Sequence, residues 1–147
     1  MGIGYREATQ DDIPLLARMN RVLIRYEDSE NPMDTARLIE RMEGFLAGAY
    51  TAVLLLGDND ITGYCLYRSE LPESGSRRVY VRQFYILPGF RRQGLGGRAF
   101  RQLLDTVFTD ADEITLDVLD GNSAGRAFWE SLGFAPYCHR LRLKRDM

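Results

Sequence analysis

Hydrophobic and polar residues follow two different periods along the chain, and these periods predict an ordered series of strands and helices. Runs of apolar or alternating residues, which are typical of strands, occupy residues 3–8, 50–56, 61–71, 79–86, 113–119 and 137–143. Apolar residues spaced three or four positions apart, which indicate helices, occupy residues 9–26, 34–46, 94–108 and 123–131. The order β-α-α-β-β-β-α-β-α-β predicts an α+β fold of mixed α/β type, with one domain covering residues 1–147.

Turn and capping residues mark the ends of several of these elements. Thr9 and Asp12 open the first helix in a pattern close to a capping box, and Gly48 and Gly133 stop two later helices. Residues 57–60, Gly-Asp-Asn-Asp, predict a hairpin turn between two strands.

The composition, 45% apolar and 27% charged, is that of a globular protein and excludes several classes. No apolar run approaches the roughly 20 residues of a membrane span, and no signal-peptide pattern is visible. Cys65 and Cys138 are too few for a disulfide framework, so we expect a cytoplasmic location. His139 is the only histidine, so we expect no metal site, and the net charge of −2 argues against nucleic-acid binding.

The charges are unevenly distributed. Between Ser74 and Leu104 there is no acidic residue, but there are seven arginines, at positions 77, 78, 82, 91, 92, 98 and 101. Acidic residues instead cluster between the first two helices, as Glu27, Asp28, Glu30 and Asp34. The basic stretch predicts binding of an anion.

The centre of the basic stretch combines a strand, a glycine-rich turn and the start of a helix. Residues 86–97 read Ile-Leu-Pro-Gly-Phe-Arg-Arg-Gln-Gly-Leu-Gly-Gly. The first amide groups of a helix have no intrahelical partners, its dipole favours negative charge, and small residues let phosphate oxygens approach the backbone. We therefore expect a phosphate group here, and we expect a side chain at Gly94 or Gly96 to displace it.

Two nucleotide-binding motifs compete for this stretch. A P-loop of the Walker type is excluded because no Gly-Lys-Ser/Thr occurs and Lys144 is the only lysine. Residues 94–99 match the dinucleotide pattern G-x-G-x-x-A, but seven residues separate Gly94 from the strand end at Ile86. Only about 50 residues follow, too few for a doubly wound sheet, so a dinucleotide-binding protein stays a remote alternative.

Two segments resemble the GNAT (Gcn5-related) N-acetyltransferases. Arg91-Arg-Gln-Gly94-Leu-Gly96 resembles the family's Arg/Gln-x-x-Gly-x-Gly/Ala signature. Residues 122–134, Asn-Ser-Ala-Gly-Arg-Ala-Phe-Trp-Glu-Ser-Leu-Gly-Phe, resemble its Asn-x-x-Ala-x-x-Phe-Tyr-x-x-Leu-Gly-Phe segment. The resemblance implies a central mixed sheet flanked by helices, acetyl-CoA as cosubstrate, and direct transfer of an acetyl group to a primary amine of a small molecule, peptide or protein.

The resemblance also implies roles for individual residues. The amide groups of residues 93–97 would hold the pyrophosphate, the strand backbone at residues 84–86 would pair with the pantetheine arm, and one strand amide near Tyr85 or Ile86 would polarise the carbonyl. The coenzyme-binding residues would be Phe84, Tyr85, Ile86, Arg91, Arg92, Gln93, Gly94, Leu95, Gly96, Gly97, Arg98, Asn122, Arg126 and Trp129.

The chain departs from the family where acid–base chemistry is expected. Trp129 replaces the tyrosine that commonly protonates the leaving thiolate, so Tyr137 is the candidate acid, with water as the alternative. Gln83 lies where many relatives carry glutamate and would orient a substrate or a water, and Glu30 is the candidate proton acceptor. The acceptor is expected at Tyr26, Glu27, Glu30 and Asn31.

These departures leave a second interpretation open, a CoA-binding regulatory module with weak catalysis. A homodimer through the C-terminal strand is compatible with either interpretation.

Overall fold

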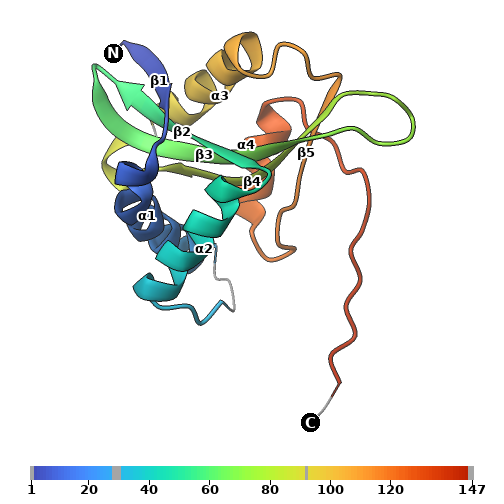
Figure 1. Ribbon diagram of the computed structural model, residues 1–147. Helices are drawn as coiled ribbons and strands as arrows, with labels where there is room; N and C mark the ends of the chain where they lie inside the picture. Colours follow the sequence, from blue (N-terminus) through green and yellow to red (C-terminus); the bar gives the residue numbers. More distant parts are fainter. Residues whose placement is uncertain (1, 28–30, 92, 146–147) are drawn as a thin grey trace.

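A five-stranded sheet in the order β1-β2-β3-β4-β5 forms the centre of the computed structural model, which describes residues 2–27, 31–91 and 93–145 (Figure 1). The strands are β1 (Ile3–Glu7), β2 (Tyr50–Gly57), β3 (Asp60–Glu70), β4 (Arg78–Ile86) and β5 (Glu113–Leu116). The helices are α1 (Ile13–Tyr26), α2 (Thr35–Ala47), α3 (Leu95–Thr106) and α4 (Ser123–Ser131), with two 3₁₀ turns, η1 (Gln10–Asp12) and η2 (Pro88–Phe90). The mixed α+β architecture predicted from the periodicity is confirmed.

The local signals in the sequence act as expected. The Asp12 carboxylate accepts a hydrogen bond of 2.8 Å from the Thr9 amide, the second half of a capping box. Asp34 caps α2 by accepting a hydrogen bond from the Arg37 amide at 2.9 Å. At the β2–β3 turn, Asp58 and Asn59 have φ angles of 51° and 71°, as a two-residue hairpin turn requires.

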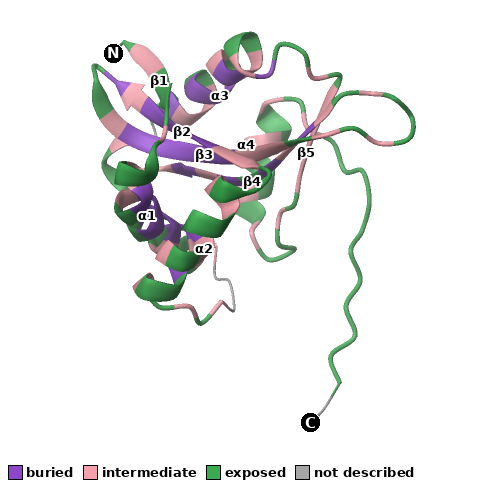
Figure 2. Ribbon diagram, in the orientation of Figure 1, coloured by how far each residue is buried: buried purple, intermediate pink, exposed green. Residues whose placement is uncertain are grey.

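The sheet separates two hydrophobic cores. On one face, α1 and α2 bury residues such as Leu16 and Met42 against β2, β3 and β4. On the other face, α3 packs Phe100 and Leu103 against the same strands and α4 adds Trp129. Figure 2 shows the buried residues concentrated in the strands and in the faces of the helices that touch them. Each face of the sheet therefore presents a different set of side chains to its helices.

A β-bulge at Arg82 changes which face the β4 side chains occupy. Strand β3 pairs Leu66 with Gln83 and then Tyr67 with Val81, so Arg82 is an extra residue in β4. Val81 belongs to the core under α3, whereas Tyr85, four positions later, belongs to the core under α1 and α2. The bulge thus shifts the alternation of β4 by one residue, so that Tyr85 faces α1 and α2 while Phe84 and Ile86 face α3.

The predicted C-terminal strand at residues 137–143 is wrong for this structure. Residues 135–145 are extended but form no strand, and they lie exposed along the tail that leaves the domain (Figures 1 and 2). The exposed fractions of Tyr137, Leu141 and Leu143 are 76%, 91% and 85%. Alternation makes a segment able to form a strand, but a strand also needs a neighbour to pair with its backbone.

Two further expectations need adjustment. The strand expected at 113–119 is shorter, since β5 ends at Leu116. Cys138 and His139 lie in the exposed tail, not in a strand. In the described part of the chain, no helix is long and apolar enough to cross a membrane.

Candidate functional site

The N-terminus of α3 presents its first backbone amides beside open space. Gly94 is the N-cap residue with φ of 70°, and a Cβ built on it would meet no atom within 4 Å. The first intrahelical bond joins the Arg98 amide to the Gly94 carbonyl at 3.1 Å, so the amides of residues 95–97 precede the helical hydrogen-bond pattern. Such a helix start, with no acidic residue in its first turn, suits a phosphate group.

Gly96 has a different role from Gly94. A Cβ on Gly96 would lie 3.3 Å from the Phe128 ring and 3.5 Å from the Ile86 side chain. A side chain here would therefore meet protein before it met a ligand, which corrects the expectation that Gly94 and Gly96 act alike. Gly96 lets α3, α4 and the end of β4 come together.

Strand β4 separates from β5 halfway along its length. The two strands pair only from Arg78 with Glu113 to Val81 with Leu116, and β4 continues to Ile86. The Leu87 amide donates to the Thr62 carbonyl of β3 at 2.7 Å. Because the backbone groups of successive strand residues point to opposite sides, those of Tyr85 also point toward β3, and those of Phe84 and Ile86 point away from it. The amides of Phe84 and Ile86, rather than that of Tyr85, thus face the notch between the separated strands.

Arg91 connects this notch to the helix α1. Its Nε donates to the Ile86 carbonyl at 2.7 Å, and its guanidinium lies 3.8 Å from the centre of the Tyr26 ring. The buried Arg91 Nη1 and the buried Tyr85 hydroxyl have no hydrogen-bond partner among the described residues. Arg92 lies outside the described residues, so its predicted role stays a prediction.

The remaining candidate coenzyme residues divide between the rim and the core. Gln93, Arg98 and Arg126 are exposed, and the Asn122 side chain caps α4 by accepting a hydrogen bond from the Gly125 amide at 3.0 Å. Leu95 is buried, so only its backbone can contact a ligand. Trp129 packs into an aromatic cluster, with ring centres 5.4, 5.0, 4.8 and 5.3 Å from those of Phe84, Phe100, Phe128 and Phe134.

A chain of buried and half-buried polar side chains lies on the opposite face of β4. Arg41 donates from Nη2 to Oδ1 of Asn20 at 2.8 Å, and the Asn20 amide favours the ionised form of the Tyr64 hydroxyl. Tyr64 in turn donates to Oε1 of Gln83 at 2.7 Å. Burial raises the pKa of Tyr64 well above its usual value, so this hydroxyl keeps its proton.

The predicted acceptor residues lie around the end of α1. Glu27 follows the last residue of α1, and burial raises the pKa of its carboxyl group. Its negative charge acts on the hydroxyl of Tyr64, which belongs to the polar chain that ends at Gln83. Tyr26 is exposed beneath the Arg91 guanidinium, and Asn31 accepts a hydrogen bond from the Met33 amide at 2.9 Å. Glu30 lies outside the described residues.

Tyr137 is not brought together with the other candidates. It lies in the exposed tail, and its hydroxyl acts electrostatically on Arg78, at the opposite end of β4 from Ile86. Nearby, burial and a 2.9 Å hydrogen bond to Asp117 raise the pKa of Tyr80 to about 12.

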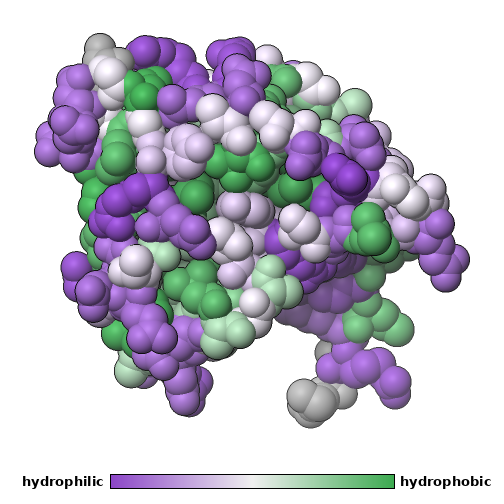
Figure 3. All heavy atoms as spheres, turned by 45° about the horizontal axis from the view of Figure 1, so that its top comes forward, coloured by the Kyte–Doolittle hydropathy of each residue, from purple (hydrophilic) through white to green (hydrophobic). Residues whose placement is uncertain are grey.

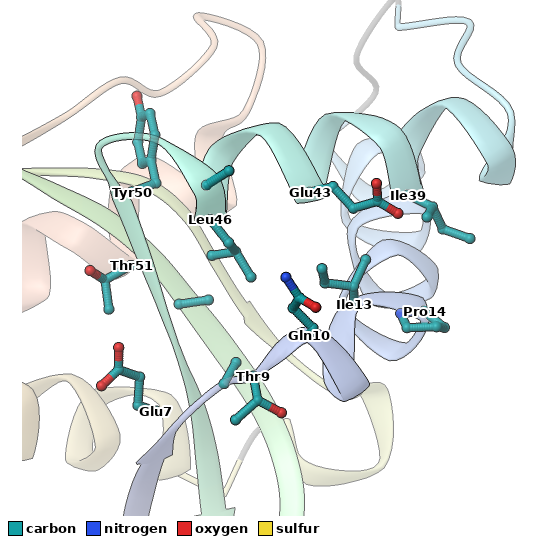
Figure 4. Close-up of a pocket in the computed structure, with 13 residues that line it drawn as sticks. Glu7, Thr9, Gln10, Ile13, Pro14, Ile39, Glu43, Leu46, Tyr50 and Thr51 are labelled. Atoms are coloured by element: carbon teal, nitrogen blue, oxygen red, sulfur yellow. The ribbon is translucent and has the colours of Figure 1, made fainter.

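A separate hollow of about 690 Å³ lies between α2 and the ends of β1 and β2 (Figure 4). Glu7 and Glu43 lie on opposite sides of it, and Tyr50 stands at its rim. This hollow is at the other end of the sheet from the α3 N-terminus. Among residues 2–27, 31–91 and 93–145, no group of three metal-ligating side chains is found.

The sequence interpretation missed Asn20, Arg41 and Tyr64. Asn20 is 2% exposed although it is an amide on a helix, and Tyr64 is fully buried. The only local signal was the position of Asn20 beside Met19 on the apolar face of α1, where an amide requires a buried partner.

Comparisons with known proteins agree with this geometry. Residues 16–134 match the acetyltransferase (GNAT) family. The thialysine N-epsilon-acetyltransferase of Bos taurus is 24% identical over 138 residues, covering 87% of this chain and 81% of its own, and the Mus musculus protein is 25% identical with the same coverage.

Solved structures share the fold. A possible acetyltransferase from Clostridium difficile 630 superposes with a TM-score of 0.82 at 17% identity, covering 99% of this chain and 98% of its own. A predicted acetyltransferase from Clostridium acetobutylicum, solved with acetyl-CoA, gives 0.72 at 20% identity, with coverage of 97% and 96%. With a glycine-rich helix start, a notch in β4 and a family match over most of its length, the chain belongs to the acetyltransferase (GNAT) family, whose cosubstrate is acetyl-CoA.

Proposed function

We propose that this protein transfers an acetyl group from acetyl-CoA directly to a primary amine of a small molecule, peptide or protein. The observation that carries the proposal is the notch beside Phe84 and Ile86, which joins the α3 N-terminus on one side to a polar cluster on the other. The thialysine acetyltransferases act on a small amine by their name, which supports an amine acceptor here.

The coenzyme fits the groups that the chain presents. The amides of residues 95–97 and the open space at Gly94 suit the pyrophosphate, and the outward amides of Phe84 and Ile86 suit the pantetheine arm and the acetyl carbonyl. Acetyl-CoA supplies an acetyl group activated as a thioester. Gln93, Arg98, Arg126 and Asn122 would line the rim, with Arg92 as a further charged contact.

The acid–base groups follow from the placement of the side chains. Glu27 would attract the ammonium group of the acceptor and take up a proton from it, with Glu30 as a second carboxylate in the same turn. The Trp129 indole packs in the aromatic cluster and Tyr137 lies in the exposed tail, so we assign protonation of the leaving thiolate to water.

A thiol-release assay with a panel of amines tests the proposal. We expect acetyl-CoA to stabilise the protein in a thermal-shift measurement and an amine to release free CoA. Stabilisation by acetyl-CoA with no thiol released by any amine would instead support the regulatory CoA-binding module. The dinucleotide alternative requires a doubly wound parallel sheet, and the antiparallel β1–β4 meander contradicts it.

Glu27→Gln should separate activity from stability as the pH changes. Because burial raises the pKa of Glu27, the ionised carboxylate destabilises the fold at alkaline pH, while the protonated form does not. The variant should therefore unfold at a higher temperature than the wild type at pH 8, and the difference should shrink toward pH 4. Its kcat/KM for the amine should fall about a hundredfold and lose its dependence on this ionisation.

Thermal unfolding and initial rates from pH 4 to pH 9 check this prediction. Glu43→Gln, at the separate hollow beside α2, removes a carboxylate from the same face of the sheet and serves as the control. If both variants keep the wild-type pH–rate profile, Glu27 has no role in proton transfer.

We also propose a homodimer in which the tail of one copy pairs with a second copy. Leu141 and Leu143 alternate with Arg140, Arg142 and Lys144, a pattern that suits an added edge strand, and residues 135–145 lie outside the sheet. Hydrophobic spheres in Figure 3 gather in several separate patches between hydrophilic ones, so this face offers no single large apolar interface. The cytoplasmic location and the single domain stay predictions.

Leu141→Asp should convert a dimer to a monomer in light-scattering measurements, because a charge would enter the paired strand face. Lys144→Asp introduces the same carboxylate into the tail at a polar position and should leave the dimer intact. A wild-type monomer at high micromolar concentration would rule out the strand-mediated dimer.

A further inference from the structure

Two arginines meet over one aromatic ring on the α1–α2 side of β4. The guanidinium carbons of Arg41 and Arg82 lie 5.5 and 4.8 Å from the centre of the Phe45 ring. Neither forms an ion pair with a described carboxylate, whereas other arginines of the same sheet do: Arg68 pairs with Glu70, and Arg78 pairs with Glu113. Two positive charges are therefore held together without a neutralising group in the described part of the chain.

The electrostatics of Arg41 reflect this crowding. Burial and then repulsion by Arg82 lower the pKa of the Arg41 guanidinium. Its Nε is buried and has no hydrogen-bond partner in the described structure. Leaving such a donor unpaired costs free energy, and an anion bound between the two guanidinium groups would offset their repulsion.

The polar chain that begins at Arg41 fixes the direction of Gln83. An arginine can only donate hydrogen bonds, so Arg41 occupies Oδ1 of Asn20 and leaves the amide nitrogen as the Asn20 group that can act on the Tyr64 hydroxyl. Tyr64 then donates to Oε1 of Gln83 at 2.7 Å. The free end of the chain is the Gln83 amide nitrogen, a donor, to which the described structure supplies no acceptor.

The backbone of Arg82 and Gln83 lies where the notch opens, and the Arg82 guanidinium extends from there over Phe45 and donates to the Tyr50 hydroxyl at 3.4 Å. Arg82 is the bulged residue and Gln83 follows it, directly after the last β4–β5 pair at Val81. The charge of Glu27, which would hold the ammonium group, also acts on the Tyr64 hydroxyl of this chain. The region thus presents a carboxylate near one part of the acceptor and unneutralised donors near another.

We propose that Arg41 and Arg82, with the Gln83 amide, bind a carboxylate carried by the amine acceptor. The acceptor is then a small molecule or chain end with both an amine and a carboxylate, such as an amino acid. That this ligand is the acetyl acceptor rests on the proposed function. The carboxylate site itself can be tested by binding measurements alone.

Matched amines with and without a carboxylate test the proposal. L-lysine and cadaverine differ only in the carboxylate, as do ornithine and putrescine. For wild-type protein with acetyl-CoA, we expect kcat/KM to favour the carboxylate-bearing member of a pair at least tenfold. In Arg82→Gln the two kcat/KM values should become about equal, because KM for the carboxylate-bearing amine rises. The kcat/KM for the amine without a carboxylate should stay unchanged.

Calorimetry with CoA-loaded protein and the same amines provides a readout that does not depend on turnover. We expect the same preference and the same loss in Arg82→Gln, while Arg18→Gln, an exposed arginine on α1, keeps the wild-type values. If binding shows the preference but no amine is acetylated, the carboxylate site stands and the proposed function fails.

Three results would overturn the carboxylate site. Equal affinities for the two members of every pair would show that no carboxylate is recognised. An equal loss for both members in Arg82→Gln would show that Arg82 only supports the strand. Tighter binding of phosphoethanolamine than of β-alanine would assign the arginines to a phosphate.

Discussion

Gly94→Asp is expected to lower the affinity for acetyl-CoA at least about a hundredfold. The new carboxylate would lie at the α3 N-terminus, where we place the pyrophosphate, and like charges about 5 Å apart near a protein surface repel by roughly 3 kcal/mol. The fold should survive, because a Cβ at Gly94 meets no atom within 4 Å and aspartate tolerates a φ of 70° better than most residues. Isothermal titration calorimetry with acetyl-CoA measures the loss.

Gly94→Asn is the matched control. Asparagine has nearly the same size and the same tolerance of the left-handed region, but it carries no charge. We expect the affinity of this variant for acetyl-CoA to lie within about tenfold of the wild-type value, a much smaller loss than in Gly94→Asp. Equal affinities for the two variants, weak or strong, would mean that no phosphate charge lies near Gly94.

Gly63→Ala should destabilise the protein by about 3 kcal/mol or more. A Cβ at Gly63 would lie 1.8 Å from the Tyr85 carbonyl oxygen, a backbone atom of β4 that is fixed by the β3–β4 pairing. The strands would have to move apart next to the notch, and overpacking of this kind is among the costliest single changes. Urea unfolding followed by circular dichroism gives the loss in free energy, and the same displacement should weaken acetyl-CoA binding.

Gly44→Ala is its control on helix α2. A Cβ there meets no atom within 4 Å, and alanine favours a helix over glycine by about 1 kcal/mol, so this variant should be slightly more stable than the wild type. If Gly63→Ala were as stable as Gly44→Ala, the close approach of β3 and β4 at the notch would be contradicted.

The sequence predicted the elements well wherever local chemistry decides them. The Thr9–Asp12 contact, the Asp34 cap and the turn at Asp58 and Asn59 all depend on residues within three positions of each other, and all are present. The helix start at residue 94 could be placed for the same reason, since a glycine-rich break before a helical period is a local signal.

Features that depend on distant segments could not be predicted in this way. The bulge at Arg82 is a matter of register between β3 and β4, and a period of two residues does not reveal where one strand has an extra residue. The tail at residues 137–143 has the alternation of a strand, but its pairing depends on a neighbour that the pattern does not specify.

The candidate site also combines a part that local sequence predicts with a part that depends on distant segments. The α3 cradle is contiguous in sequence, so its residues could be proposed together. Arg41, Asn20 and Tyr64 come from α2, α1 and β3, and only the packing of those elements on β4 brings them to Gln83. Gln83 itself was singled out from the family pattern, but its role as a donor follows from its three-dimensional partners.

Mass analysis of a single turnover tests the central claim most directly. Excess protein is mixed with acetyl-CoA and an amine that carries a carboxylate. The masses of the amine, the coenzyme and the intact protein are then measured by mass spectrometry. Direct transfer at the β4 notch predicts one acetylated amine for each CoA formed and no acetyl group on the protein. An acetylated protein that forms without amine, or bound acetyl-CoA that yields no acetylated amine with any acceptor, would contradict it.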